Sequence, residues 1–398
     1  MRWTEQPLES LCLHATSGGT PATSDPSLYD GDIPWLRTQE VNFNFITDTE
    51  ITITEAGLEK SAAKWIPENS VIVALYGNSA GRVAVNKIPL TTNQACGNFI
   101  IDPEKADYRF VYYSLLKDYE ILHGMSKGAA QNNLNLAMVK QYKLRTPDLP
   151  VQQRIGGMLV AYDDLIENNR RWMALLEETA RLLYREWFVR LRFPGHENTH
   201  IVDGVPEGWK DCPIRDFGEV ITGKTPSTKE SDNYGGEIPF IKTPDMHDNV
   251  FVIQTETNIT DKGANTQSGK FIPPDTLLVS CIGTIGVVSI TSARSQFNQQ
   301  INAVMPFDEA YRYYCFFAFK NLKGGMEAIG GGATMGNVNK TKFEGLCVLK
   351  PSIFLLREFH DVCTPMFQQI QALSCQKIKL RAARDLLLPH LMRGDLTS

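Results

Sequence analysis

Apolar residues recur at alternating steps of four and three between Val151 and Arg190, a stretch that contains no proline. This spacing is typical of the seam of a coiled coil, although an ordinary buried helix has a related pattern. We expect one helix of about 40 residues, roughly 60 Å long. The seam positions are Ile155, Leu159, Tyr162, Ile166, Asn169, Met173, Leu176, Ala180, Leu183 and Trp187. Asn169 is the one strongly polar residue among them, and a single buried Asn typically fixes the register of a coiled coil.

A second helix is predicted from about Leu355 to Arg393. Thr364-Pro365 interrupts it, so we expect a restart or a kink there. Lys377 and Arg384 fall on its seam, which is therefore less regular than the first. Its apolar positions are Ile370, Leu373, Leu380, Leu387 and Leu391. Two helices of similar length in one chain are expected to pair antiparallel, each covering the other's apolar stripe.

The whole chain is two copies of one unit, and each copy has a globular part followed by one of these helices. The segment "TPATSDPSLYDGDIPWLRT" from Thr20 aligns without a gap with "TPSTKESDNYGGEIPFIKT" from Thr225, and collinear matches continue on both sides as the offset drifts from 206 to 204. Each copy is rich in Gly, Pro, Asn and Thr, with short β-like runs such as "VIVALYG" and "TLLVSCIG". We therefore expect an α+β fold with an internal pseudo-two-fold repeat. Two similar globular units of mixed helix and mainly antiparallel strands would be separated by two long antiparallel coiled-coil helices.

The predicted boundaries follow from this repeat. They are a first globular unit at 1–148, a first helix at 151–192, a linker at 193–208, a second globular unit at 209–350 and a second helix at 353–395.

Composition narrows the function classes. The net charge of −5 counts against a protein that coats nucleic acid everywhere, but it allows local basic surfaces. None of the eight cysteines forms a C-x-x-C pair, so reduced thiols are expected rather than a disulfide framework or a zinc ribbon. No apolar run reaches the length of a membrane span, and the N-terminus does not resemble a signal peptide. We expect a cytoplasmic protein with no membrane partner.

Two motifs suggest enzyme chemistry but lie in unsuitable contexts. "GEVITGKT" from Gly218 to Thr225 fits the P-loop pattern, yet Pro226 follows at once and no helical pattern comes next. "HENTH" from His196 to His200 fits a zinc-protease pattern, yet it lies in the linker. Methyltransferase signatures such as N-P-P-[YF] and G-x-G-x-x-G do not occur. We expect no catalytic centre and no metal site in this chain.

The chain resembles the specificity subunit of type I restriction-modification enzymes over nearly its whole length. The resemblance is carried by the paired "G-x-TP" and "Y-x-G-x-IP-[WF]" segments, "LLYREWFVRLRFPG", "PEGW" at Pro206 to Trp209, and "LLLPHLMRGDL". It implies that the globular units are target recognition domains, each reading one half of a split site on double-stranded DNA. It also implies that the helices form a spacer and dock two modification subunits, which methylate adenine with S-adenosylmethionine. Restriction subunits would bring ATP and Mg²⁺, so no cofactor belongs to this chain.

Candidate DNA contacts lie in the loops of both copies. Arg37 and Lys242 occupy matching positions, and Lys and Arg on phosphates supply most of the affinity for DNA. Contacts that set specificity are expected to differ between the units, because the two halves of such sites usually differ. The candidates are Arg37, Asn78, Ser79, Arg82, Asn93, Gln94, Lys127, Gln131, Asn132, Lys224, Lys242, Asn298, Gln299, Thr334 and Asn337. Two alternatives stay open: a helical adaptor or inhibitor of the methylase that binds no DNA, and a nucleotide-binding enzyme that uses Gly218–Thr225.

Overall fold

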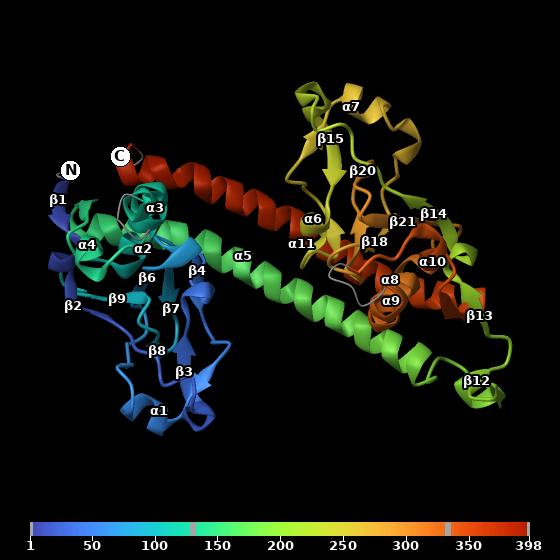
Figure 1. The fold of residues 1–398 in the computed structure, drawn as a ribbon, viewed down its shortest axis with the longest axis horizontal. Coiled ribbons are helices and arrows are strands. Elements are labelled where there is room, and N and C mark those ends of the chain that lie inside the picture. Colours follow the sequence, from blue (N-terminus) through green and yellow to red (C-terminus); the bar gives the residue numbers. More distant parts are fainter. Residues whose placement is uncertain (1–2, 128–132, 331–335, 396–398) are drawn as a thin grey trace. The chain divides into compact units, whose positions relative to one another are not determined.

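The computed structural model describes residues 3–127, 133–330 and 336–395. Its internal contacts define two units: unit 1 comprises 1–165 and 380–398, and unit 2 comprises 166–379 (Figure 1). Each unit therefore combines one repeat with segments of both long helices. In the part of the chain described, none of the helices has the length and hydropathy of a membrane span.

Unit 1 contains a five-stranded sheet, a three-stranded sheet and a strand pair. The five-stranded sheet has the order β2-β9-β6-β7-β4 and the three-stranded sheet the order β5-β3-β8; all their pairs are antiparallel except β4–β7 and β3–β8. Strand β1 pairs antiparallel with β10. The strands are β1 (Thr4–Pro7), β2 (Cys12–Ser17), β3 (Tyr29–Leu36), β4 (Asn44–Ile46), β5 (Thr52–Ile53), β6 (Val71–Ala74), β7 (Val83–Asn86), β8 (Thr91–Thr92), β9 (Cys96–Ile101) and β10 (Lys143–Thr146). The helices of this repeat are α1 (Glu55–Glu59), α2 (Tyr108–Lys117), α3 (Tyr119–Lys127) and α4 (Leu136–Lys140).

Unit 2 repeats this topology strand for strand. Its five-stranded sheet has the order β14-β21-β18-β19-β16, its three-stranded sheet the order β17-β15-β20, and β13 pairs with β22. The strands are β13 (Lys210–Pro213), β14 (Gly218–Thr222), β15 (Tyr234–Ile241), β16 (Phe251–Val252), β17 (Asn258–Ile259), β18 (Leu277–Ser280), β19 (Val288–Thr291), β20 (Gln296–Phe297), β21 (Ile301–Pro306) and β22 (Cys347–Lys350). The helices are α6 (Thr243–Met246), α7 (Asp261–Asn265), α8 (Tyr311–Asn321), α9 (Lys323–Ile329) and α10 (Lys340–Glu344), and a small hairpin pairs β11 (Ile201–Val202) with β12 (Val205–Pro206). The predicted fold class is confirmed, with parallel strand pairs that the sequence did not indicate.

Many residues shared by the two repeats stabilise this fold. The Tyr29 hydroxyl donates to the carbonyl of Pro21, and the Tyr234 hydroxyl donates to that of Pro226, both at 2.8 Å. Asn135 caps the N-terminus of α4 as Asn339 caps that of α10. The repeated signature is therefore largely a signature of turns and caps.

The long helices are α5 (Leu149–Tyr184), which continues into a π-helical turn at Arg185–Val189, and α11 (Ile353–Arg393). Of the restart or kink expected at Thr364-Pro365, the restart is wrong, because α11 passes through as one helix, and the kink stays a prediction. A proline inside a helix costs about 3 kcal/mol. Burial of Cys363 and Phe367 on either side offsets that cost, and the Thr364 hydroxyl donates to the carbonyl of His360 at 2.8 Å.

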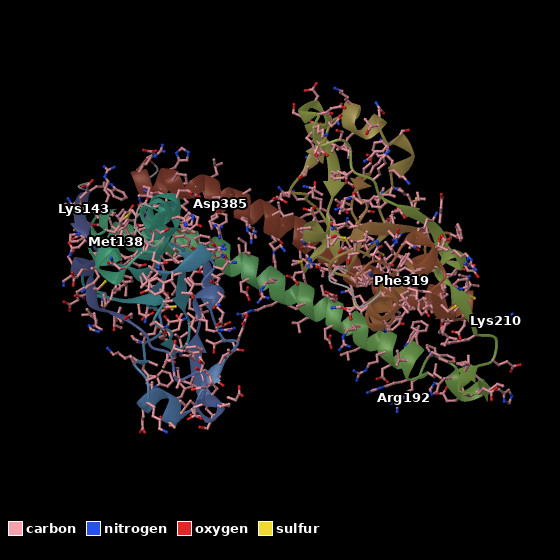
Figure 2. All side chains as sticks on the ribbon, viewed as in Figure 1. Met138, Lys143, Arg192, Lys210, Phe319 and Asp385 are labelled. Atoms are coloured by element: carbon pink, nitrogen blue, oxygen red, sulfur yellow. The ribbon has the colours of Figure 1, made fainter. Side chains whose placement is uncertain are left out.

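Each unit buries one end of each long helix in its main core. In unit 1, Ile155 and Leu159 of α5 share a cluster with Leu388, Leu391 and Met392 of α11. In unit 2, the corresponding cluster contains Ala180 and Tyr184 of α5, Phe188 of the π-helical turn, Phe359 and Phe367 of α11, and buried aromatic rings of α8 such as Phe319 (Figure 2). Helix packing therefore completes both cores.

Candidate nucleic-acid interface

Each unit has a glycine loop between two central strands of its five-stranded sheet. In unit 1 the loop joins β6 to β7, and in unit 2 it joins β18 to β19. All four glycines of the loops have positive φ, a conformation that favours glycine: Gly77 (+71°), Gly81 (+87°), Gly283 (+76°) and Gly286 (+82°). A Cβ on Gly286 would lie 2.7 Å from Cγ of Lys323 in α9, so this loop also needs glycine for close packing.

The loop of unit 1 borders an open hollow of about 470 Å³. Its lining is mostly polar, and Arg82 is the charged side chain in it. The lining residues are Thr38, Gln39, Tyr76, Gly77, Asn78, Ser79 and Arg82. Arg82 donates from Nη1 to Oδ1 of Asn42 at 3.0 Å, which orients the guanidinium group. Its Nε is buried and has no hydrogen-bond partner among the described residues. The side chains of Gln39 and Asn78 are exposed. Within the described part of the chain, this hollow presents several donors and acceptors that have no partner.

The loop of unit 2 borders a smaller hollow of about 290 Å³ with different chemistry. It is lined by Gly283, Thr284, Ile285, Lys323, Glu327 and Gly336. Val287 occupies the position that follows the second glycine, where unit 1 has Arg82. Both hollows therefore border the equivalent glycine loop, but the unit 1 hollow extends to the turn at Thr38 and the unit 2 hollow extends to α9, and they offer different hydrogen-bonding groups.

Arg37 and Lys242 occupy equivalent places, each directly before a short helical turn. Both are already engaged: Arg37 forms an ion pair with Glu50, and Lys242 Nζ donates to Oγ1 of Thr257 at 2.7 Å. The Arg37 Nε is buried without a hydrogen-bond partner in the described part of the chain. Any phosphate contact by these cations would therefore compete with bonds inside the protein.

The paired Asn-Gln positions serve the turns of the scaffold. The Oδ1 atoms of Asn93 and Asn298 accept backbone N–H groups two residues further on, at 3.2 and 3.1 Å. Gln94 and Gln299 each accept a hydroxyl from a threonine of the shared "TP" segment, Thr20 and Thr225. These four side chains are thus used within their own units.

The remaining candidates are scattered. Lys224 is exposed just beyond β14, so the P-loop-like segment is a sheet strand followed by an extended segment. Asn337 is exposed and bridges Ile282 by its backbone. Ser79 lies in the unit 1 hollow, where its hydroxyl donates to the carbonyl of Tyr76 at 3.3 Å. Lys127 ends α3. Gln131, Asn132 and Thr334 lie outside the described residues.

The seam residues of α5 all lie on its covered side. Ile155, Leu159, Asn169 and Ala180 are buried, and Tyr162, Ile166, Met173, Leu176, Leu183 and Trp187 are partly buried. On α11, Ile370, Leu373 and Leu391 are buried, and Leu380 and Leu387 are partly buried. Within unit 2 the helices run antiparallel, because Asn169 donates to Gln376 at 3.2 Å while Met173, further along α5, contacts Ser374, further back on α11.

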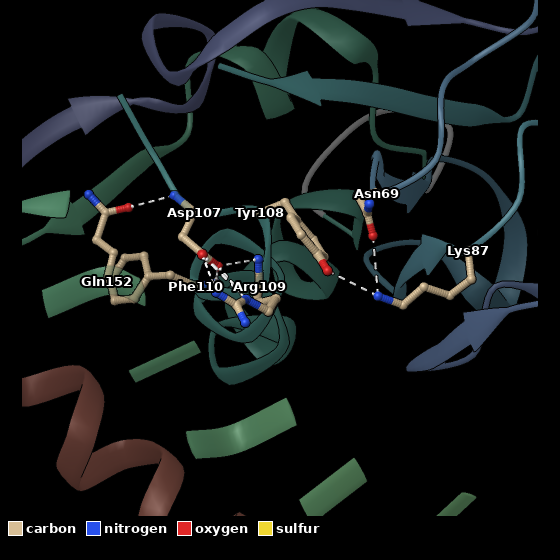
Figure 3. A network of polar contacts seen from close by, with 7 residues as sticks. All are labelled: Asn69, Lys87, Asp107, Tyr108, Arg109, Phe110 and Gln152. Carbon is tan, nitrogen blue, oxygen red and sulfur yellow. Dashed lines mark hydrogen bonds and ion pairs between the residues drawn. The ribbon is translucent and has the colours of Figure 1, made fainter. Parts of the chain in front are cut away.

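Sequence reasoning missed two polar networks of unit 1. In the first, Lys87 lies 3.3 Å from Oδ1 of Asn69 and 3.1 Å from the Tyr108 hydroxyl (Figure 3). Beside it, Asp107 caps α2, and its backbone N–H donates to Gln152 of α5 at 3.1 Å. The bond between Asp107 and Gln152 anchors the start of α5 to the start of α2. No local sequence motif predicts these contacts, because the partners are far apart in sequence.

The second missed network contains Tyr113, Asp163 and Arg384, which come from three helices of unit 1. Asp163 accepts the Tyr113 hydroxyl and forms an ion pair with Arg384. Its only sequence signal is the presence of Arg384 on a seam that is apolar apart from this residue and Lys377. A charged residue on such a seam indicates a buried partner, since unpaired buried charge is costly.

Similarity to known proteins follows the same two-fold repetition of the chain. The family model "Type I restriction modification DNA specificity domain" matches residues 2–178 and again residues 206–352. The chain is 31% identical over 320 residues to the type I restriction enzyme HindI specificity subunit of Haemophilus influenzae, covering 65% of this chain and 70% of that protein. It is 25% identical over 393 residues to the MjaIX specificity subunit of Methanocaldococcus jannaschii, covering 95% and 90%.

A solved structure has the same fold. The S subunit of a type I restriction-modification system from M. genitalium superposes with a TM-score of 0.64 at 15% identity, covering 98% of this chain and 96% of that one. The family model covers most of the chain in two separate matches, one to each repeat. The chain therefore belongs to the family of type I restriction modification DNA specificity domains.

Proposed function

We propose that this chain is the non-catalytic DNA-recognition subunit of a type I restriction-modification complex, and that each unit reads one half of a split site. The observation that carries the proposal is a family match in both repeats, combined with different side chains at the same glycine loop. Base edges in the major groove present distinct donor and acceptor patterns, so two hollows with different groups suit two different half-sites.

Within this proposal, residues that differ between the units set specificity. Arg82, Asn78 and Gln39 are the proposed readers in unit 1, and Thr284 and Lys323 are those in unit 2. Arg82 suits the O6 and N7 atoms of guanine, and an amide side chain suits the N6 and N7 atoms of adenine. Arg37, Lys242 and Lys224 are proposed to position the backbone of the DNA, since phosphate contacts carry no sequence information directly.

The long helices are the proposed docking surface for two modification subunits. Trp172 and Leu175 of α5 lie one helical turn apart in unit 2 and are 53% and 62% exposed, and the exposed Leu182 and Val189 follow further along the chain. Contiguous exposed apolar side chains commonly mark protein interaction sites. In such a complex, adenine methylation with S-adenosylmethionine and the ATP- and Mg²⁺-dependent steps belong to the modification and restriction subunits. We place the assembly in the cytoplasm, where its DNA lies.

Domain exchange tests this function. Residues 20–147 would be replaced by the matching segment of a relative, and adenine methylation would be mapped across the genome of cells that also express the modification subunit. We expect one half of the methylated motif to change and the other half to persist. The matched control exchanges residues 225–351, which should change only the other half. Assembly with the methylase without any DNA binding would instead favour a helical adaptor or inhibitor.

A further inference from the structure

Unit 1 contains a buried ionic cluster on its helix packing surface. Asp163 of α5 uses one carboxylate oxygen for the Tyr113 hydroxyl of α2 and the other for the Arg384 guanidinium of α11. The Asp163 and Arg384 side chains are 10% and 13% exposed. Arg384 also contacts the Asp385 carboxylate at 2.7 Å. Burial and the Asp163 carboxylate both raise the pKa of the Tyr113 hydroxyl, so Tyr113 acts as a neutral donor. We call Tyr113, Asp163 and Arg384 the polar pairing site.

The same place in unit 2 is apolar. The offset of 204 that matches Pro147 to Pro351 also matches Asp163 to Phe367, and it matches Ala180 to Arg384. When α2 is aligned with α8 at Lys117 and Lys320, Phe316 is the residue of unit 2 that is equivalent to Tyr113. Phe316 and Phe367 are in contact, with ring centroids 5.5 Å apart, and Ala180 is fully buried in the same cluster. We call Phe316, Phe367 and Ala180 the apolar pairing site.

We propose that these two sites determine which helix end each unit accepts. Unit 1 accepts the end of α11, which carries Arg384, and unit 2 accepts the second half of α5, which carries Ala180. The helices are otherwise built on one repeated pattern, so a second copy of the chain offers a competing arrangement. In that like-with-like arrangement, the second half of α5 from another copy would close unit 1, and the end of α11 from another copy would close unit 2.

Both contacts of the like-with-like arrangement are unfavourable. Unit 1 would bury the Asp163 carboxylate against alanine, without its cation. Unit 2 would bury the Arg384 guanidinium against Phe316 and Phe367. Breaking a buried ion pair by removing one partner biases an equilibrium by roughly 150- to 4,000-fold. The sites therefore favour closure of the chain on itself and reject a second copy.

A neighbouring surface pair contributes less to this choice. Lys320 of unit 2 forms an ion pair with Glu177, and Arg381 is the residue of α11 that matches Glu177. In the like-with-like arrangement unit 2 would lose this pair, while the matching Lys117 of unit 1 would face Glu177 of another copy. One pair is lost and one is gained, and exposed ion pairs are weak in any case. The buried pairing sites therefore determine the preference between the self-closed chain and the like-with-like arrangement.

The test moves the arginine in the full-length chain. A moved-arginine variant carries Ala180→Arg and Arg384→Ala. Its self-closed chain mismatches both sites, whereas its like-with-like dimer satisfies both. With two sites the bias toward the dimer becomes about 10⁴-fold or more. This exceeds the advantage of a tethered contact, which corresponds to an effective concentration in the millimolar range. Size-exclusion chromatography with light scattering, after unfolding and refolding at about 10 μM, should give a monomer for the unchanged chain and a dimer for this variant.

An exchanged variant is the matched control. It transfers the complete sites between the units with Tyr113→Phe, Asp163→Phe and Arg384→Ala in unit 1 and with Phe316→Tyr, Phe367→Asp and Ala180→Arg in unit 2. The self-closed chain then satisfies both sites again, so this variant should be a folded monomer. A moved-arginine variant that stays monomeric with unchanged thermal stability would overturn the proposal. So would unfolding of the moved-arginine variant beside a folded exchanged variant, or dimerisation or unfolding of the exchanged variant.

Discussion

Replacing Arg82 with alanine should relax recognition at one base pair of the unit 1 half-site. The 3.0 Å bond from Nη1 to Asn42 orients the guanidinium group. Nε is buried, so Nη2 and the second N–H of Nη1 remain for DNA. A good bidentate contact to guanine contributes about 1–3 kcal/mol of discrimination against the wrong base. Since 1.4 kcal/mol corresponds to a factor of ten, we expect preference at that base pair to fall by roughly 5- to 150-fold.

Equilibrium binding of DNA by the assembled complex measures this effect. Fluorescence anisotropy would be recorded for duplexes that carry each single-base change in either half-site, at several salt concentrations. The Arg82→Ala complex should lose discrimination at one position of one half and keep it in the other half. Arg82→Lys retains the charge but not the bidentate geometry, so it should relax the same position. Val287→Ala at the matching position of unit 2 is the control, and it should leave the preference of both halves almost unchanged.

The salt dependence identifies the competing explanation. If Arg82 contacts a phosphate, its removal should weaken binding to all duplexes alike and reduce the salt slope by about 0.9. Uniform weakening of that kind, or unaltered discrimination in Arg82→Ala, would refute the assignment of Arg82 as a reader. The domain-exchange result would still stand, so the proposed function and this residue can fail separately.

Three further predictions concern the helices. Leu159→Ala removes a fully buried side chain from the unit 1 core and should lower the free energy of unfolding by about 2–5 kcal/mol, measured by denaturant titration. Burial, reinforced by Arg312, lowers the pKa of His360, which stacks on Tyr313. The unfolded chain therefore binds this proton more readily, so stability should fall as pH drops below about 6.5. His360→Gln should reduce the difference between the melting temperatures measured at pH 7 and at pH 5. Trp172→Lys with Leu175→Lys should abolish co-purification of the modification subunit while the melting temperature stays nearly unchanged, since both side chains are exposed; retained co-purification would contradict the docking surface.

The long helices and the duplication could be predicted from sequence because their signals are local or repeated. The seam of α5 has the same four-three spacing throughout, and each of its positions is at least partly covered in the structure. The restart at Pro365 failed because a proline rule is local, whereas burial of Cys363 and Phe367 in the core is tertiary. Helix propensity is a weak guide where packing on both sides fixes the backbone.

The candidate DNA contacts were less predictable for a related reason. Asn93 and Gln299 are polar, lie near glycine loops and recur in both repeats, yet their side chains bond within their own units. The sequence did not indicate that Gln39 and Tyr76 line the unit 1 hollow, because only the three-dimensional arrangement of β3, β6 and β7 brings them there. Asp163 and Arg384 are 221 residues apart, so their pairing has no local signal.

Comparison of the two repeats separates these classes of residue. Where the repeats are identical, the side chain bonds inside its own unit, as the Tyr29 and Tyr234 hydroxyls do. A bond of that kind depends only on the fold, so duplication preserves its use in both copies. Where the repeats differ at equivalent positions, the side chain contacts something outside the repeated fold, and what it contacts differs between the two units. Arg82 against Val287 changes what a hollow offers to DNA, and Asp163 against Phe367 changes which helix end the core accepts. A chain that must read two unlike half-sites and close in one orientation needs asymmetry at these positions, because a fully symmetric repeat would give identical readers and interchangeable helix ends.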